Sequence, residues 1–117
     1  MIGMLVAAAL VFALGLLTLW WARACLRGTL PRNRIFGYRT RLTLSSTTAW
    51  VATHRAAGPF VVVAGLGASI AALVGAVLAL TGHDAASPAF FGGGLVWLLA
   101  WVLVGIVPAH RAAKRLR

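Results

Sequence analysis

Residues 58–80 read GPFVVVAGLGASIAALVGAVLAL, and this stretch decides the fold. It has no ionisable side chain and, as a helix, would be about 35 Å long, enough to cross the hydrocarbon core of a bilayer. Small residues recur in it every four positions, at Gly67, Ala71, Gly75 and Ala79, and beside them at Ala64, Ala68, Ala72 and Ala76. Lipid gives helices no hydrophobic reason to associate, so a face that allows close backbone approach predicts helix packing. We expect a transmembrane helix at the centre of a bundle or at an oligomer face; generic Ala-rich filler is the alternative.

Two further uncharged runs, residues 1–22 and 89–107, are also long enough to cross a membrane. The chain has 117 residues, of which 62% are hydrophobic. A core this small could not hide so much apolar surface from water. The sequence therefore predicts an all-α, polytopic membrane protein, residues 1–117 forming one domain with three transmembrane helices. No Lys or Arg precedes Arg23, which favours a permanent first span over a cleaved signal peptide.

The charges are distributed unevenly along the chain. The formal net charge is +10, from eleven Lys and Arg and a single acid, Asp84. All eleven basic residues fall in residues 23–57 and 108–117, whereas residues 81–88 contain none of them. The positive-inside rule predicts that residues 23–57 form a cytoplasmic loop and residues 108–117 a cytoplasmic tail. Residues 81–88 would then form an outer loop, with the N-terminus outside.

The same charges indicate the partners. Because the basic residues adjoin apolar segments, anionic lipid headgroups at the inner face are favoured over nucleic acid. We also expect a protein partner or a homo-oligomer. His54 and His110 are expected to be solvated or interfacial. With one acid in the chain and no ionisable residue in the spans, the sequence predicts no catalytic, cofactor or metal site and argues against a proton-coupled transporter.

An arginine-rich polar island, PRNRIFGYRTRLTLSS at residues 31–46, follows the first span. Pro31 and Gly37 interrupt any helix there. Ser45 or Ser46 is a suitable N-cap for a short amphipathic cytoplasmic helix that runs to Ala57. Gly58–Pro59 would make the bend into the second span.

The island resembles the SdpI family of bacterial membrane proteins. The residues that carry the resemblance are Asn33, Gly37-Tyr38-Arg39-Thr40, Leu44-Ser45 and Trp50. They match a signature of Asn, a short gap, Gly-Ile-Arg-Thr, a gap with Leu and Ser, and Trp; Tyr38 replaces the usual aliphatic residue. The resemblance covers roughly residues 20–80 and is to the family's C-terminal-type domain alone, a short form. It implies a multi-pass protein of the bacterial plasma membrane.

The resemblance implies a non-catalytic role, in toxin-peptide immunity, envelope-stress signalling or the docking of a partner through the basic loop. The alternative is an accessory subunit of a larger bacterial membrane complex, docked through the small-residue face of the second helix. The motif itself has two interpretations. Arg39, with the turn at Gly37 and the Thr40 hydroxyl, could hold a lipid phosphate or an acidic protein partner. Alternatively the motif is a structural lock, in which Arg39 binds helix-end carbonyls, Asn33 caps a turn and Trp50 seals the bundle.

Overall fold

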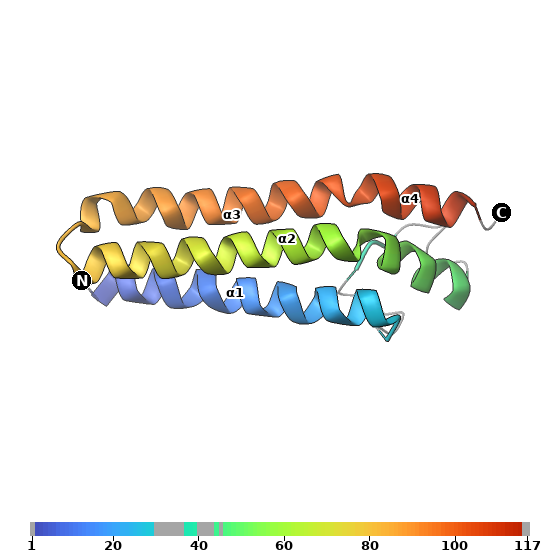
Figure 1. Ribbon diagram of the computed structural model, residues 1–117, viewed down its shortest axis with the longest axis horizontal. Coiled ribbons are helices and arrows are strands. Elements are labelled where there is room, and N and C mark those ends of the chain that lie inside the picture. The colour runs from blue at the N-terminus through green and yellow to red at the C-terminus, as the bar shows by residue number, and fades with distance from the viewer. Residues whose placement is uncertain (1, 30–36, 40–43, 45, 116–117) are drawn as a thin grey trace.

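The computed structural model describes residues 2–29, 37–39, 44 and 46–115. The described part of the chain is helical and has no strand; its elements are α1 (Ile2–Arg27), α2 (Thr47–Leu80), the 3-10 helix η2 (Asp84–Ala86), α3 (Ser87–Val104) and α4 (Ile106–Lys114). Together they form an elongated bundle measuring 56 × 20 × 19 Å (Figure 1). Three helical stretches are long and apolar enough to cross a membrane: Ile2–Arg27, Thr47–Leu80 and Asp84–Lys114. The predicted all-α architecture with three candidate spans is therefore confirmed.

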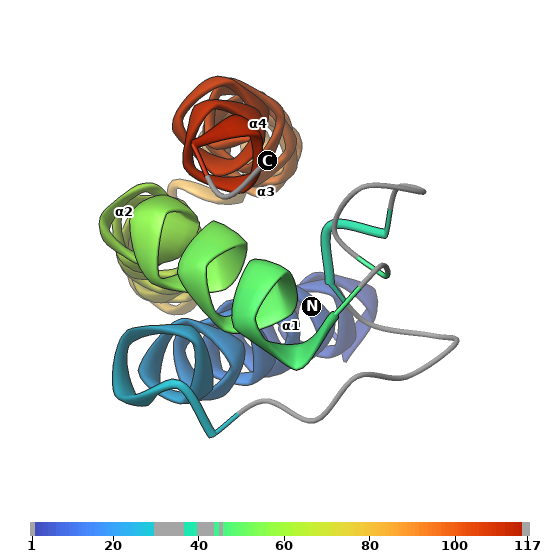
Figure 2. The same cartoon turned by 90° about the vertical axis from the view of Figure 1, so that its right-hand side faces the viewer.

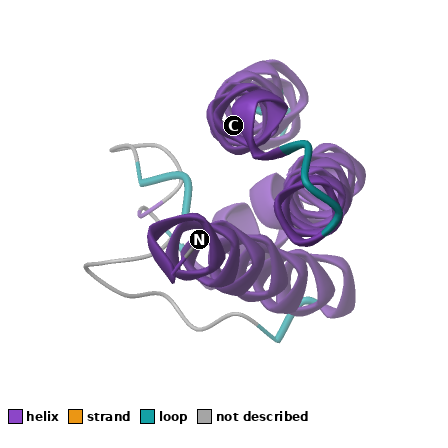
Figure 3. Cartoon of the chain, turned by 90° about the vertical axis from the view of Figure 1, so that its left-hand side faces the viewer, coloured by secondary structure: helices purple, strands orange, loops and turns teal. Residues whose placement is uncertain are grey.

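Helix α2 lies between the other two spans. Viewed along the bundle, α1 packs on one side of α2, and α3 with α4 pack on the other (Figures 2 and 3). The C-terminus of α1, the N-terminus of α2 and all of α4 lie at one end of the molecule (Figure 1). We call this the basic end, because it holds the arginines of α1 and α4. Asp84 lies at the opposite end.

The short helix expected before the second span is not a separate element. Residues 47–57 are helical, and Ser46 caps them by accepting a hydrogen bond from the Ala49 N–H at 3.0 Å. However, they continue through Pro59 into the rest of α2. Proline removes one backbone donor and crowds the carbonyl of the preceding turn, which kinks a helix without necessarily ending it. The first turns of α2 accordingly tilt away from the axis of the remainder (Figures 1 and 2).

The third span is interrupted near its basic end. Helix α3 ends at Val104 and α4 begins at Ile106, so Gly105 separates them. Pro108 explains the position of this break, because it has no N–H to donate to the carbonyl of Val104. The span predicted at residues 89–107 thus includes the junction and the first residues of α4.

Small residues bring α2 close to both neighbours. On the α3 side, a Cβ added to Gly67 would overlap the indole of Trp97, and one added to Gly75 would overlap the ring of Phe91. On the α1 side, a Cβ at Gly65 would lie 2.9 Å from the carbonyl oxygen of Gly15. Of the stripe singled out in the sequence, Gly67, Gly75 and Ala71 lie against α3, and Ala79 is fully buried. Most of that stripe therefore packs against another helix of the same chain.

The Trp97 indole demonstrates the consequence of this close approach. Its Nε1–H donates to the Val63 carbonyl at 2.9 Å, although 44% of the side chain is exposed. An indole N–H in hydrocarbon needs an acceptor, and the contact at Gly67 lets the ring reach one. Trp97 thus bonds to α2.

A glycine-to-alanine pair tests this packing. Gly67→Ala is expected to destabilise the bundle by about 1–3 kcal/mol, because the new methyl group overlaps the Trp97 ring. Gly92→Ala should be neutral or stabilising by up to about 1 kcal/mol, since no atom lies within 4 Å of its added Cβ and alanine is the better helix former. The thermal midpoints of the two variants in one detergent provide the comparison. Equal midpoints would show that Gly67 is not needed for close packing.

Candidate functional site

Four aromatic rings gather at the basic end, one from α1, one from the loop and two from α2. The ring centroids of Trp21 and Tyr38 are 5.6 Å apart, those of Tyr38 and His54 are 5.8 Å apart, and those of His54 and Trp50 are 4.2 Å apart. Trp50 and His54 are each only 1% exposed. We call this cluster, together with Gly37, the Tyr38 lock.

His54 holds the loop through its ring nitrogens. The Tyr38 backbone N–H donates to His54 Nε2 at 2.9 Å, and His54 Nδ1 lies 2.7 Å from the Trp50 carbonyl oxygen. Because Nε2 accepts a hydrogen bond, it must be unprotonated, and Nδ1 must carry the proton donated to Trp50. Both nitrogens of the neutral imidazole are therefore occupied, and the ring positions the loop.

The Tyr38 side chain reaches across to the third span. Its hydroxyl donates to the Val102 carbonyl oxygen, 64 residues further along the chain. The hydroxyl passes so close to Gly105 that a Cβ there would contact it. Burial raises the pKa of the Tyr38 phenol above its ordinary value, which keeps the hydroxyl in the neutral form that can donate. Tyr38 thus connects the loop to α2 through its backbone and to α3 through its side chain.

Gly37 is required by both its backbone conformation and its surroundings. Its φ is +109°, a region that side-chain-bearing residues rarely adopt. A Cβ at this position would lie 2.5 Å from His54 Nε2 and 2.9 Å from Trp50 Cη2. Any larger residue would displace the loop from the imidazole.

The structure brings only part of the sequence motif together. Gly37 and Trp50 are in direct proximity within the lock, and Arg39 is exposed beside it. Asn33 and Thr40 lie outside the described residues. A different arginine contacts the end of α1: Arg55 donates from Nη2 to the Arg27 carbonyl oxygen at 3.4 Å.

His54 is the residue that the sequence interpretation missed. It was expected to be solvated or interfacial, and that expectation is wrong, because the ring is buried beneath Tyr38. The available signal was the spacing of Trp50 and His54, four apart on one helix face with Ala57. An aromatic residue and a histidine on a face shared with a small residue indicate a packed surface.

The hydrogen bonds of the site connect the loop to α2 and α3. Cys25, at the end of α1, is fully buried and packs in a cluster with Trp50. Among the described residues no group of three or more metal-ligating side chains occurs. Arg39, next to the lock, is exposed.

The candidate spans and the loop locked against them define a multi-pass α-helical membrane protein. The model of the SdpI/YfhL protein family matches residues 29–112, which include the lock loop, α2, α3 and most of α4. The chain belongs to this family, as its motif predicted. Neither the curated proteins nor the solved structures contain a match to the chain.

The lock can be tested through its phenol, because Tyr38 is the only tyrosine in the chain. An exposed tyrosine titrates near about pH 10, and we expect the wild-type phenol to stay neutral well above that value. The folded state holds this proton more tightly than the unfolded state, so stability should fall as the pH rises past about 10. Gly37→Ala should move the pKa of the phenol back toward its ordinary value, as followed by tyrosinate absorbance.

Gly82→Ala is the matched control. Gly82 also has a positive φ, of 83°, but no atom lies within 4 Å of an added Cβ and it is at the far end of the bundle. This variant carries a similar backbone strain and should leave the phenol pKa unchanged. If both variants shift it equally, or neither does, Gly37 does not seat Tyr38.

Proposed function

We propose that this protein is a non-catalytic member of the SdpI/YfhL family that docks a partner protein through its basic cytoplasmic loop. Toxin-peptide immunity and envelope-stress signalling at the bacterial plasma membrane are the two roles that such docking would serve. The lock is the observation that carries the proposal, because it attaches the loop to two spans at once.

The attachment gives the loop a mechanical link to the membrane. The backbone of Tyr38 is bound to α2 and its hydroxyl to the end of α3. A relative shift of these helices would break one bond or carry Gly37–Arg39 with it. Packed interfaces respond to small shifts by switching between discrete arrangements. The loop could thus report a change in the bundle, caused by a bound toxin or by envelope stress, to a partner in the cytoplasm.

The charge of the site favours an acidic partner. Arg39 is exposed beside the lock, and a guanidinium can bind a carboxylate through two parallel hydrogen bonds. The one acidic side chain of the sequence, Asp84, lies at the other end of the bundle. An acidic surface of a cytoplasmic protein is the partner that this arrangement would recognise.

The alternative proposal is an accessory subunit of a larger membrane complex. The docking surface first considered for it, the small-residue face of α2, is covered by Trp97 and Phe91 of α3. A subunit role would therefore use the outward faces of α1 or α3, and co-purification of a stoichiometric membrane partner in mild detergent would support it.

Capture from native membranes tests the docking role. Arg39→Ala is expected to lower recovery of a cytoplasmic partner at least about tenfold, since charged hydrogen bonds contribute about 1.5–3 kcal/mol. Arg23→Ala removes an equally exposed charge on α1 and should leave recovery unchanged. Equal recovery by wild type and Arg39→Ala, with normal insertion of both, would refute the role of Arg39.

Cysteine labelling tests the orientation on which the proposal depends. In a Cys25→Ala background, His83→Cys and His110→Cys place thiols at exposed positions at opposite ends of the bundle. A membrane-impermeant maleimide should label His83→Cys in intact cells, or in spheroplasts, and should reach His110→Cys only after the membrane is opened. The reverse pattern would place the basic end outside the cell and end the cytoplasmic docking proposal.

A further inference from the structure

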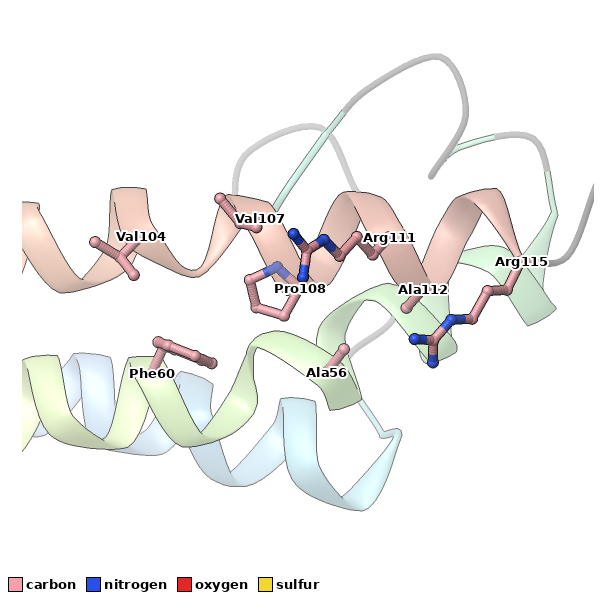
Figure 4. A pocket seen from close by; sticks show the side chains of 8 residues that line it. All are labelled: Ala56, Phe60, Val104, Val107, Pro108, Arg111, Ala112 and Arg115. Carbon is pink, nitrogen blue, oxygen red and sulfur yellow. The ribbon is translucent and has the colours of Figure 1, made fainter.

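A groove runs along the basic end between α2 and α4, on the surface away from α1. Its volume is about 420 Å³. Apolar side chains line one part of it, and two arginines line the other; the residues that matter here are Phe60, Val104, Val107, Pro108, Arg111 and Arg115 (Figure 4). The groove is distinct from the Tyr38 lock, with which it shares no lining residue.

The two arginines act on the same groove. Arg111 is in α4 and Arg115 is the residue that ends it; because the two are four residues apart, they lie on one side of the helix. Figure 4 shows both guanidinium groups turned back along α4, over Pro108 and Ala112, rather than outward from the end of the helix. Asp84, the one acidic side chain of the sequence, lies at the opposite end of the molecule from both arginines.

The order of the side chains along the groove matches that of a phospholipid. Val104 and Val107 are about half exposed, and Arg111 begins one turn beyond Val107. The apolar side chains of the groove thus lie toward the candidate spans and the two arginines toward the end of the bundle, the same order as acyl chain and phosphate in a phospholipid. Phe60 provides an aromatic wall on the apolar side.

We propose that this groove binds one anionic phospholipid, with an acyl chain against Phe60 and Val104 and the phosphate between Arg111 and Arg115. Two guanidinium groups can bind several phosphate oxygens through charge-assisted hydrogen bonds. The occupant is a lipid and not an acidic protein segment, because the apolar part of the groove belongs to two candidate membrane spans. The proposal requires only a membrane protein and does not depend on the docking role of Arg39.

The α3–α4 junction shapes the site. Pro108 forms part of the wall, and the break at Gly105 sets the direction in which α4 leaves α3. A groove that is already formed between packed helices binds with less ordering cost than a flexible basic tail would. The lipid should therefore stay bound through purification in mild detergent.

Native mass spectrometry of the delipidated protein with added phosphatidylglycerol tests the proposal. The Arg111→Gln/Arg115→Gln variant should bind phosphatidylglycerol at least about tenfold more weakly than wild type, given two lost charged contacts. Arg23→Gln/Lys114→Gln loses the same charge at exposed positions outside the groove and should bind as wild type does. An equal loss in both variants would show attraction by net charge alone and would overturn the proposal.

Further binding measurements test whether the lipid occupies the groove. Ala112→Leu keeps both arginines but fills the groove, and it should also lose the tightly bound phosphatidylglycerol; unchanged binding would overturn the proposal. Phosphatidylcholine, whose headgroup has no net charge, should bind more weakly. Inorganic phosphate should not displace the bound lipid, because it cannot occupy the apolar part, and efficient displacement would show that only a phosphate is held.

Discussion

In a bilayer, apolar helices gain nothing by hiding from lipid tails, so this bundle depends on how closely α2 can approach α1 and α3. Glycines make that approach possible on both sides. Gly67 and Gly75 leave room for the rings of Trp97 and Phe91, and Gly65 lies against the backbone of Gly15. Close packing of this kind maximises dispersion contacts, and it brings the Trp97 N–H to a carbonyl on α2.

The lock at the basic end depends on that spacing. Tyr38 can reach the His54 ring and the Val102 carbonyl at once only while α2 and α3 stay together. Each of these hydrogen bonds contributes little by itself, about 0.5–1.5 kcal/mol. Their value lies in specificity, because they give the loop one position relative to the spans. The packing of the membrane part and the placement of Arg39 are thus parts of one arrangement.

The junction between α3 and α4 links the two proposed sites. Gly105 admits the Tyr38 hydroxyl on one side, while Pro108 forms part of the wall of the lipid groove on the other. A lipid bound against α4 would therefore adjoin the element on which the lock closes. The two sites nevertheless use different residues.

The sequence by itself determined the membrane class, the three spans, the asymmetry of charge and the family. The spans follow from local composition and length. In lipid, the backbone N–H and C=O groups of an uncharged run of about 20 residues need hydrogen-bond partners, and a helix provides them within the run. The sequence also identified Gly37 and Trp50, though not what they contact.

Only the tertiary structure decided how those residues act. The lock joins positions 16 and 64 residues apart, and no local pattern encodes such pairings. The burial of His54 follows from the loop that folds over it, and the continuity of α2 through Pro59 follows from packing that outweighs one lost hydrogen bond. The groove at Arg111 and Arg115 likewise exists only because α4 lies against the start of α2. The sequence of a segment predicts whether that segment lies in lipid or in water. The contacts between distant segments depend on how the helices pack against one another.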